Sequence, residues 1–460
     1  MTTAVEIEQL RSTFRGPIIT PEDDGYDEAR KVWNGMIDRR PAIIARCCGV
    51  ADVIAALRCA RENGLLIAVR GGGHSFPGHS VCDDGIVIDL SGMKGVRVNV
   101  ERRTVHVQAG ATWGDLDHET QAFGLAVPGG VVSTTGIAGL TLGGGTQSWL
   151  ARKYGITVDN LLSADVVTAD GRYLRASAEE DPDLFWALKG GGGNFGIVTS
   201  FEYRLHSVGP VVLAGAAFYP WQRVREVARF YLDYVRDIPD ELTSALYLWT
   251  APPVPFLPDS AHNKMFAIIA LCYAGSPEAG ERVIAPVRAL QPEVDMVMPM
   301  PYTVLQSMFD AIVPKGILAY SKSDYFDEIS DGMGEEMVLR AEGRPSPLTL
   351  LHLNHYGGAV SRIRVDATPF AHRGAQFAFS EASLWSDPAQ TDANVRWTQD
   401  CWSAMRKFGP RGAYVNFLAD EGRDRVRESY GANYDRLAAI KAKYDPENVF
   451  RLNQNIKPEP

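Results

Sequence analysis

The chain has 460 residues, of which 45% are hydrophobic and 22% charged, and a formal net charge of −10. This composition is typical of a folded globular protein and excludes a disordered, collagen-like or disulfide-dense chain. The acidic balance argues against nucleic-acid binding, which needs Lys and Arg to neutralise phosphates. The six cysteines match no zinc-binding spacing, so we predict no metal site.

The chain begins without an apolar run of the kind found in secretory signals. Its longest apolar stretches, such as FAIIAL at 266–271, are too short to cross a bilayer. We therefore expect a cytoplasmic protein with no membrane attachment.

The first half of the chain alternates short strands with helices. Apolar residues recur with a 3.6-residue period over 50–63, which predicts a helix ending at Gly64, between strands at 40–47 and 65–70. A strand, a helix and a strand in this order predict a βαβ unit. Two further helices are expected at 111–124 and at 181–191, the second capped by Asp181 or Asp183. Further strands are expected at 85–90, 96–100, 104–110, 161–171 and 196–205.

The composition changes near residue 208, and we predict a second domain over 208–411 that consists of an antiparallel sheet with helices on one face. Its predicted strands are 244–250, 264–275, 349–358 and 375–385, and its predicted helices are 221–236 and 277–290. The last fifty residues are expected to form a strand at 412–418 and a helix at 433–444, which an Asp-Pro pair ends.

Glycine gathers in three clusters, at 70–75, 128–145 and 190–196. None fits the GxGxxG dinucleotide fingerprint or the GxxxxGK[ST] phosphate loop. A single cluster would be explained by turns alone. Three clusters beside strands favour an extended, phosphate-bearing cofactor that lies close to the backbone.

Longer motifs around these clusters carry a family resemblance. RGGGHSFPGHSVCDDGIVIDL, PGGVVSTTGIAGLTLGGG, KYGITVDNLLSADVVTADG and GGGGNFGIVTSFE resemble the PCMH-type FAD-binding domain of the vanillyl-alcohol-oxidase superfamily. GAYVNFL and YDPENVFRLNQNI resemble its berberine-bridge-enzyme branch. The resemblance implies a two-domain α+β fold. The FAD-binding domain would comprise 1–207 (PCMH-type part about 36–207) with a C-terminal berberine-bridge segment at 412–460, and 208–411 would bind substrate.

The resemblance also implies how the flavin is held. His74 lies where family members bond covalently to FAD, and Val132 stands where many add a cysteine tether, so we expect one covalent bond, through His74 only. The other residues implied to bind FAD are Arg70, Gly71, Gly72, Gly73, Ser75, Gly130, Val131, Thr134, Thr135, Gly136, Gly139, Gly143, Asn160, Gly193, Asn194, Gly196, Val198, Asn416, Asn453 and Asn455.

Two residues are candidate bases. Tyr414 matches the tyrosine of the family's catalytic segment, and it would need a cationic neighbour such as Arg362, Lys322 or Arg373 to ionise. His352 stands near a position where relatives often carry an acid, and it serves as base or is structural. Tyr320, Lys322 and Asn354 are expected in the substrate cavity.

The implied function is an FAD-dependent oxidase that removes hydride from a CH–OH group of a sugar or secondary metabolite. O2 would reoxidise the flavin to give peroxide, and Ile137 occupies the family position that gates oxygen. The alternatives are oxidative cyclisation or C–C/C–N oxidation in natural-product biosynthesis, a dehydrogenase with another acceptor, and a flavin-loaded binding protein without turnover.

Overall fold

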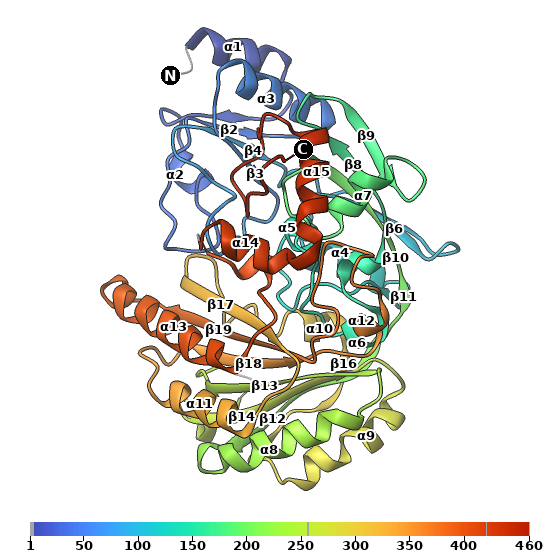
Figure 1. The fold of residues 1–460 in the computed structure, drawn as a ribbon, viewed down its shortest axis with the longest axis vertical. Coiled ribbons are helices and arrows are strands. Elements are labelled where there is room, and N and C mark those ends of the chain that lie inside the picture. The colour runs from blue at the N-terminus through green and yellow to red at the C-terminus, as the bar shows by residue number, and fades with distance from the viewer. Residues whose placement is uncertain (1–3, 255–256, 420, 460) are drawn as a thin grey trace.

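The computed structural model describes residues 4–254, 257–419 and 421–459. Figure 1 shows an elongated molecule in which both chain ends lie in the upper half and a large sheet with its helices forms the lower half. No helix within these ranges is long and apolar enough to cross a membrane.

A four-stranded sheet near the N-terminus contains the predicted βαβ unit. Helix α3 (Val50–Glu62) connects two strands that both pair in parallel with a third strand lying between them. The strand order is β1 (Ile18–Ile19), β2 (Ile43–Arg46), β4 (Ile86–Asp89), β3 (Ile67–Arg70). The helices α1 (Ala4–Thr13) and α2 (Tyr26–Ala29) precede β2.

A five-stranded antiparallel sheet follows, and its central strand, β10, is buried on both faces over most of its length. Its order is β5 (Val96–Asn99), β6 (Thr104–Gln108), β10 (Ile197–Arg204), β8 (Leu161–Val167), β9 (Tyr173–Ser177). The connecting helices are α4 (Trp113–Gln121), α5 (Ile137–Leu142), α6 (Ala151–Tyr154) and α7 (Pro182–Leu188). The short strands β7 (Leu125–Ala126) and β11 (His206–Ser207) pair with each other.

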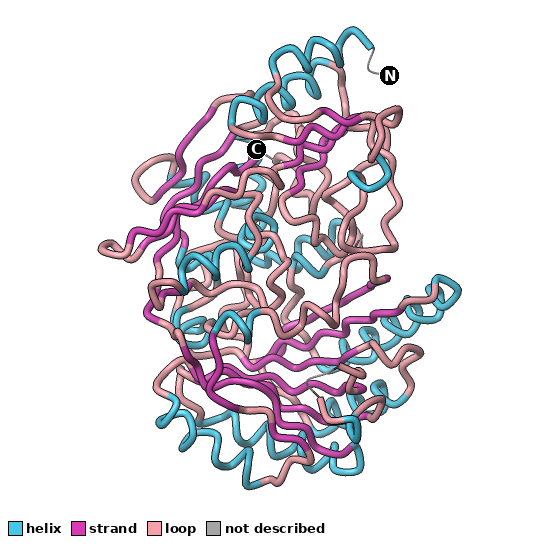
Figure 2. The backbone as a smooth tube through the Cα atoms, turned by 180° about the vertical axis from the view of Figure 1, so that it is seen from behind, coloured by secondary structure: helices cyan, strands magenta, loops and turns pink. Residues whose placement is uncertain are grey.

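An eight-stranded antiparallel sheet forms the lower half, as predicted for this part of the chain. Its order is β15 (Val294–Asp295), β12 (Val211–Pro220), β14 (Met265–Tyr273), β13 (Leu242–Thr250), β18 (Leu350–His355), β19 (Phe377–Trp385), β17 (Leu318–Phe326), with β16 (Met298–Pro301) also on β12. Figures 1 and 2 show the strands as one layer with helices on its lower face. These helices are α8 (Val224–Tyr234), α9 (Pro277–Ala289) and α11 (Asp331–Glu342). Helix α13 (Thr391–Met405) packs on β17 and β19, at the left of Figure 1.

The two faces of this sheet have different partners. Leu351 and Leu353 of β18 pack in the core between the sheet and the helices. Side chains alternate along a strand, so Leu350, His352 and Asn354 project from the opposite face, toward the upper half of the molecule. The remaining short helices of this region are α10 (Tyr302–Gln306) and α12 (Ala359–Arg362).

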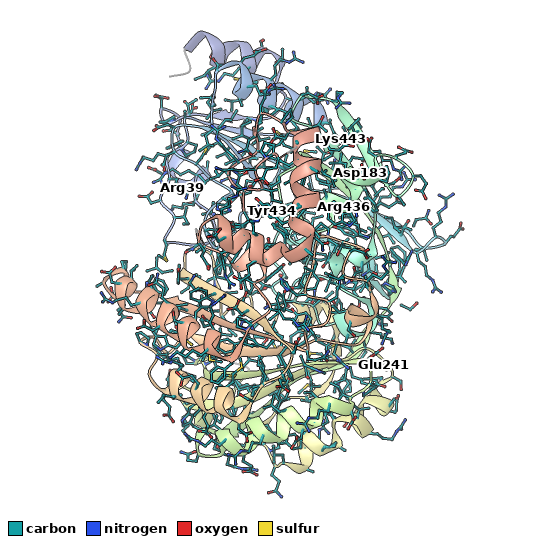
Figure 3. All side chains as sticks on the ribbon, in the orientation of Figure 1. Arg39, Asp183, Glu241, Tyr434, Arg436 and Lys443 are labelled. Atoms are coloured by element: carbon teal, nitrogen blue, oxygen red, sulfur yellow. The ribbon has the colours of Figure 1, made fainter. Side chains whose placement is uncertain are left out.

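The C-terminal segment returns to the upper half, where α14 (Arg423–Tyr430) and α15 (Tyr434–Tyr444) pack. In Figure 3, Arg436 and Lys443 of α15 lie beside Asp183 of α7. The Arg436 guanidinium and the Lys443 ammonium form ion pairs with the Asp183 carboxylate, with N···O distances of 3.9 and 3.7 Å. Asp181 occupies the N-cap position of α7, but its side chain makes no capping bond and accepts a hydrogen bond from Tyr444 instead.

The strand predicted at 412–418 is wrong. Gly412 alone forms a β-bridge, to Tyr325, and residues 415–417 turn into a 3₁₀ helix. The backbone at Gly412 has φ 143°, a conformation that favours glycine and turns the chain out of the ladder. The alternating pattern of this segment therefore does not reflect a sheet.

Candidate functional site

A cavity of about 360 Å³ lies where the glycine clusters meet the large sheet and the C-terminal segment. The first cluster contributes Gly71, Gly72, Gly73, His74 and Ser75 to its wall. The second contributes Gly130, Val131, Thr135, Gly136 and Gly139. The third contributes Gly193 and Gly196, and Val198 follows just after it. Tyr414, Asn416 and Asn453 complete the set of predicted residues that line it.

The glycines allow two kinds of close approach. A Cβ at Gly72 would lie 2.4 Å from the backbone nitrogen of Gly136, so the first two clusters touch backbone to backbone. At Gly139 and Gly193 a Cβ would meet nothing within 4 Å, and both residues line the cavity. These two positions leave bare backbone beside the space that a ligand would occupy.

Six of the predicted FAD-binding residues do not line the cavity. Arg70 pairs with Asp89 at 2.7 Å in a buried ion pair behind the first cluster. The Gly143 backbone lies against Asn416, since a Cβ there would be 2.1 Å from the Asn416 Oδ1. The side chain of Thr134 lies 3.4 Å from His74.

The other three support neighbouring structure. The amide of Asn160 donates to the carbonyls of Tyr154 and Ile156, and its Oδ1 lies 2.6 Å from His206. Asn194 donates to the carbonyl of Gln454 and accepts from the backbone N–H of Ile456. Asn194 thus holds the C-terminal segment that also contains Asn455.

His74 is held between an aromatic ring and a hydroxyl. Its imidazole stacks on the indole of Trp33 with ring centroids 4.4 Å apart and an interplanar angle of 17°. The Nε2 atom of His74 lies 3.4 Å from the hydroxyl of Thr134. Burial lowers the pKa of His74 to about 4, so the ring is neutral at pH 7 and retains a nucleophilic nitrogen.

Tyr414 lies in the same cavity with its hydroxyl oxygen accepting a hydrogen bond from the Asn416 amide at 2.9 Å. Burial raises the pKa of Tyr414 to about 12, and hydrogen bonds from Asn416 and from the backbone at Gly145 and Thr146 oppose that rise. The phenol is therefore neutral at pH 7.

The cations considered for Tyr414 are paired elsewhere. Arg362 pairs with Asp240, Arg373 with Asp159 and Lys322 with Glu421, at 2.5, 2.7 and 2.8 Å. The main influences on the pKa of Tyr414 are its burial and its hydrogen bonds, and none of these three cations is among them. Hydrogen-bond donors, and not a neighbouring cation, are what favour its phenolate.

His352 does not line the cavity, although it projects from the same sheet face as Leu350, which does. Its Nδ1 lies 2.8 Å from the Asn354 amide nitrogen, and its ring stacks on Tyr247 with centroids 5.6 Å apart. Burial lowers the pKa of His352 to about 4, which makes it a neutral imidazole at pH 7. Because Nδ1 accepts from Asn354, the ring proton resides on Nε2.

The expectation for Tyr320 and Lys322 needs correction. The Lys322 ammonium lies 4.4 Å from the ring centroid of Trp402, which belongs to α13 on the helix-covered face of the sheet. Tyr320, two residues earlier, shares that face. Asn354 lines a separate small pocket of about 30 Å³. Of the three residues expected in the substrate cavity, none lines the main cavity.

Several residues of the cavity wall were not expected from the sequence. Trp33, Phe76, Phe417, Tyr430 and Gln454 all line it. Trp33, Phe76, Phe417 and Tyr430 come from four separate segments of the chain, so no local sequence pattern brings them together. Among the described residues of the wall there is no Asp, Glu, Lys or Arg.

The residues present fit FAD. The bare backbone at Gly139 and Gly193 allows a phosphate to approach N–H groups. The buried hydroxyl of Tyr430 lines the cavity without a hydrogen-bond partner and is available to a polar ligand atom. A neutral wall suits a cofactor whose diphosphate is bound by hydrogen bonds and not by ion pairs.

The amino-acid sequence matches the family model "FAD binding domain" over residues 41–177 and "Berberine and berberine like" over 413–457. It is 31% identical to an FAD-linked oxidoreductase of Dictyostelium discoideum, over 98% of this chain and 97% of that protein. It is 31% identical to the (R)-6-hydroxynicotine oxidase of Paenarthrobacter nicotinovorans, over 97% and 98%.

Comparison of the fold with known structures identifies the same family as comparison of the sequence. The crystal structure of 6-hydroxy-D-nicotine oxidase from Arthrobacter nicotinovorans superposes with a TM-score of 0.87 at 28% identity, over 97% of this chain and 98% of the other. Similarity over nearly the whole length of each protein places both halves of the molecule in one family. This protein belongs to the berberine-bridge-enzyme-like FAD-linked oxidoreductases of the vanillyl-alcohol-oxidase superfamily.

Proposed function

We propose that this protein is an oxidase that binds FAD covalently through His74 and removes hydride from a CH–OH group of a small molecule. The observation that carries the proposal is one cavity lined by all three glycine clusters, His74 and Tyr414. FAD, when bound, supplies the hydride acceptor, and the chain supplies position and proton transfer.

We assign the FAD-binding role to 1–207 with 412–460 and the substrate-binding role to 208–411. Backbone of the glycine clusters would hold the diphosphate, with Asn453 and Tyr430 as hydrogen-bonding side chains at the same wall. The neutral imidazole of His74, fixed by Trp33 and Thr134, would be the single point of covalent attachment.

Tyr414 is the proposed base, because it lines the cavity and its oxygen already accepts hydrogen bonds that stabilise a phenolate. His352 is the alternative base. Its neutral imidazole lies two residues along β18 from Leu350, which lines the cavity, and on the same face of the sheet. The proton of the substrate hydroxyl passes to the Tyr414 oxygen, in the fraction of molecules that holds it as phenolate, as the C–H bond breaks. For His352 to take that proton, its Nδ1 must first release the Asn354 amide, because Nε2 already carries a proton.

O2 is the proposed acceptor. Ile137, the expected oxygen gate, is fully buried in the core and does not line the cavity, whereas its neighbours Gly136 and Ala138 do, so any gating by Ile137 would act through them. A dehydrogenase that uses another acceptor has the same cavity and is the main alternative. Oxidative ring closure or C–C/C–N oxidation is also carried by this fold.

The test uses purified protein expressed with ample riboflavin. We expect a yellow protein whose flavin stays with the polypeptide after acid precipitation, and an intact mass that exceeds the sequence mass by one FAD. The His74→Ala variant should remain yellow and lose the mass excess. Photoreduced enzyme mixed with air should reoxidise rapidly. Slow reoxidation would favour the dehydrogenase, and a colourless protein that takes up no FAD would overturn the proposal.

A further inference from the structure

We infer that the substrate of this enzyme is an uncharged, predominantly apolar molecule with a planar aromatic ring, and not a saccharide. The inference rests on the proposed function, because it takes the cavity as the place where FAD and substrate meet. It follows from which side chains the large sheet presents to that cavity.

Four side chains from this part of the chain line the cavity. Leu350, Ala382 and Leu384 belong to the large sheet, and Val313 belongs to the segment that precedes β17. All four are aliphatic. A wall of this kind gains binding free energy from apolar contact and offers a saccharide hydroxyl no hydrogen-bond partner.

Strand register explains why the wall is apolar. Leu350 of β18 lies directly opposite Ala382 of β19, and Ala382 lies opposite Ser321 of β17. The Ser321 hydroxyl, which would be the polar member of this row, donates to the carbonyl of Glu381 at 3.0 Å. Its donor is thus used within the sheet.

The polar side chains farther along the same face do not reach the cavity. The amide of Asn354 donates to His352, and the His352 ring stacks on Tyr247. The buried hydroxyls of Ser323 and Ser380, in the same row of the sheet as His352, have no hydrogen-bond partner. None of these four polar side chains lines the main cavity, so they do not change its aliphatic wall.

Aromatic side chains line another part of the cavity. Phe76 meets Trp33 and Phe417 edge to face, each pair with ring centroids 5.2 Å apart. All three rings line the cavity. Edge-to-face clusters of this kind accommodate a further planar ring with favourable geometry.

The electrostatics disfavour an ionic substrate. The described wall has no Asp, Glu, Lys or Arg, so a substrate carboxylate or ammonium would find no counter-ion there. The bare backbone that suits a phosphate belongs to Gly139 and Gly193 of the glycine clusters and not to the large sheet. The reacting hydroxyl of the substrate can form hydrogen bonds with Tyr414 and Asn416 of the C-terminal segment. Both residues line the cavity, and they are bonded to each other.

The experiment titrates the oxidised holoenzyme under anaerobic conditions with 4-methoxybenzyl alcohol and, separately, with cellobiose. Binding is measured as a perturbation of the flavin absorbance spectrum, which does not require turnover. We expect saturable binding of the aromatic alcohol and no saturation with the disaccharide.

Two variants place a polar group in the wall. Leu350→Asn removes apolar contact and should weaken binding of the aromatic alcohol at least tenfold. Ala382→Ser makes a smaller change, and a several-fold loss is expected. The matched control is Leu339→Asn on α11, the same substitution at a side chain that is 57% exposed, which should leave binding unchanged.

Saturable binding of cellobiose with none of the aromatic alcohol would overturn the inference, as would the absence of a spectral change with the aromatic alcohol at its solubility limit. Unchanged affinity in Leu350→Asn, with its FAD content intact, would also overturn it. Failure of the proposed function is recognised separately, because protein without bound FAD has no visible absorbance before any titration begins.

Discussion

The indole of Trp33 and the imidazole of His74 lie nearly parallel, with ring centroids 4.4 Å apart. Trp33 is itself fixed by a hydrogen bond from its Nε1 to the carbonyl of Val313, in the segment that leads into the large sheet. The adjacent Asn34 donates to the carbonyl of Ala319 in β17. The orientation of His74 therefore depends on contact between the N-terminal arm and the large sheet.

This stack predicts that Trp33 controls the rate of covalent flavin attachment. Trp33→Ala should slow attachment at least tenfold, because the imidazole loses the surface that orients it. Trp33→Phe, which retains a ring, should slow it less. The measurement is the time course of flavin fluorescence on denaturing gels after FAD is added to apoprotein.

A thermal unfolding curve for each Trp33 variant controls for loss of fold. Thr134→Val removes the hydroxyl near Nε2 without changing side-chain size, so it separates hydrogen bonding from stacking. Equal attachment rates in wild type and Trp33→Ala would refute the positioning role.

The pKa of Tyr414 predicts how hydride transfer depends on pH. Because this pKa is raised to about 12, the phenolate fraction and the rate of anaerobic flavin reduction should rise about tenfold per pH unit between pH 7 and 10. Tyr414→Phe should lower the rate a hundredfold or more and abolish this slope. Stopped-flow reduction at several pH values makes the measurement.

His352 gives a contrasting expectation. With a pKa of about 4 it does not change protonation between pH 7 and 10, so His352→Asn should leave the slope unchanged. A pH-independent rate in wild type, together with activity in Tyr414→Phe, would assign the base to a group other than Tyr414.

Asp117 of α4 predicts a pH-dependent stability. It is buried, its carboxylate accepts a hydrogen bond from Gln306 at 2.9 Å, and burial raises its pKa from 3.8 to about 7. The folded state thus binds a proton that the unfolded state releases. Stability from this group is fully present below pH 3.8 and is lost as the pH rises to 7, by up to about 4 kcal/mol.

Asp117→Asn keeps an acceptor for Gln306 and cannot ionise. Its free energy of unfolding should exceed that of wild type at pH 8, and the difference should shrink toward pH 5. Denaturant unfolding of both proteins at the two pH values tests this. A difference that does not change with pH would show that Asp117 is not protonated in the folded state.

A buried ion pair secures the C-terminal segment of the cavity wall. Lys441 of α15 donates to Asp445 at 2.6 Å and to the carbonyls of Asn194 and Phe450 at 2.7 and 2.9 Å. Lys441→Met should destabilise the protein by about 3–5 kcal/mol, because Asp445 is left buried without its counter-ion. Chemical denaturation measures the loss.

The same variant should bind FAD more weakly, since Asn453 lies in the segment that this pair anchors. Lys443→Met, at an exposed position on the same helix, is the matched control and should be close to wild type. Comparable stability of the two variants would contradict a structural role for the buried pair.

Sequence patterns predicted most of the molecule, and the failures have physical causes. The periodicity of α3 and the apolar run of β14 reflect burial, which is encoded locally. The strand at 412–418 failed because an alternating pattern of seven residues does not specify a partner strand. Lys322 was placed in the cavity without knowledge of which sheet face it would occupy, and one residue of register changes the face.

The candidate site was predictable where backbone chemistry determines it. Glycine clusters are visible in the sequence itself, and the motifs around them, together with two motifs near the C-terminus, identified the family. The aliphatic wall around Leu350 depends on cross-strand pairing of segments that are distant in sequence, so no local sequence pattern predicts it. The same holds for Trp33, whose contact with His74 spans two separate elements.

The cavity wall draws on both ends of the chain, from Trp33 to Gln454. A ribosome synthesises the residues near Gln454 long after those around His74, so the cavity is complete only when translation is nearly finished. A flavin that met the nascent polypeptide earlier would find the glycine clusters without the C-terminal part of the wall.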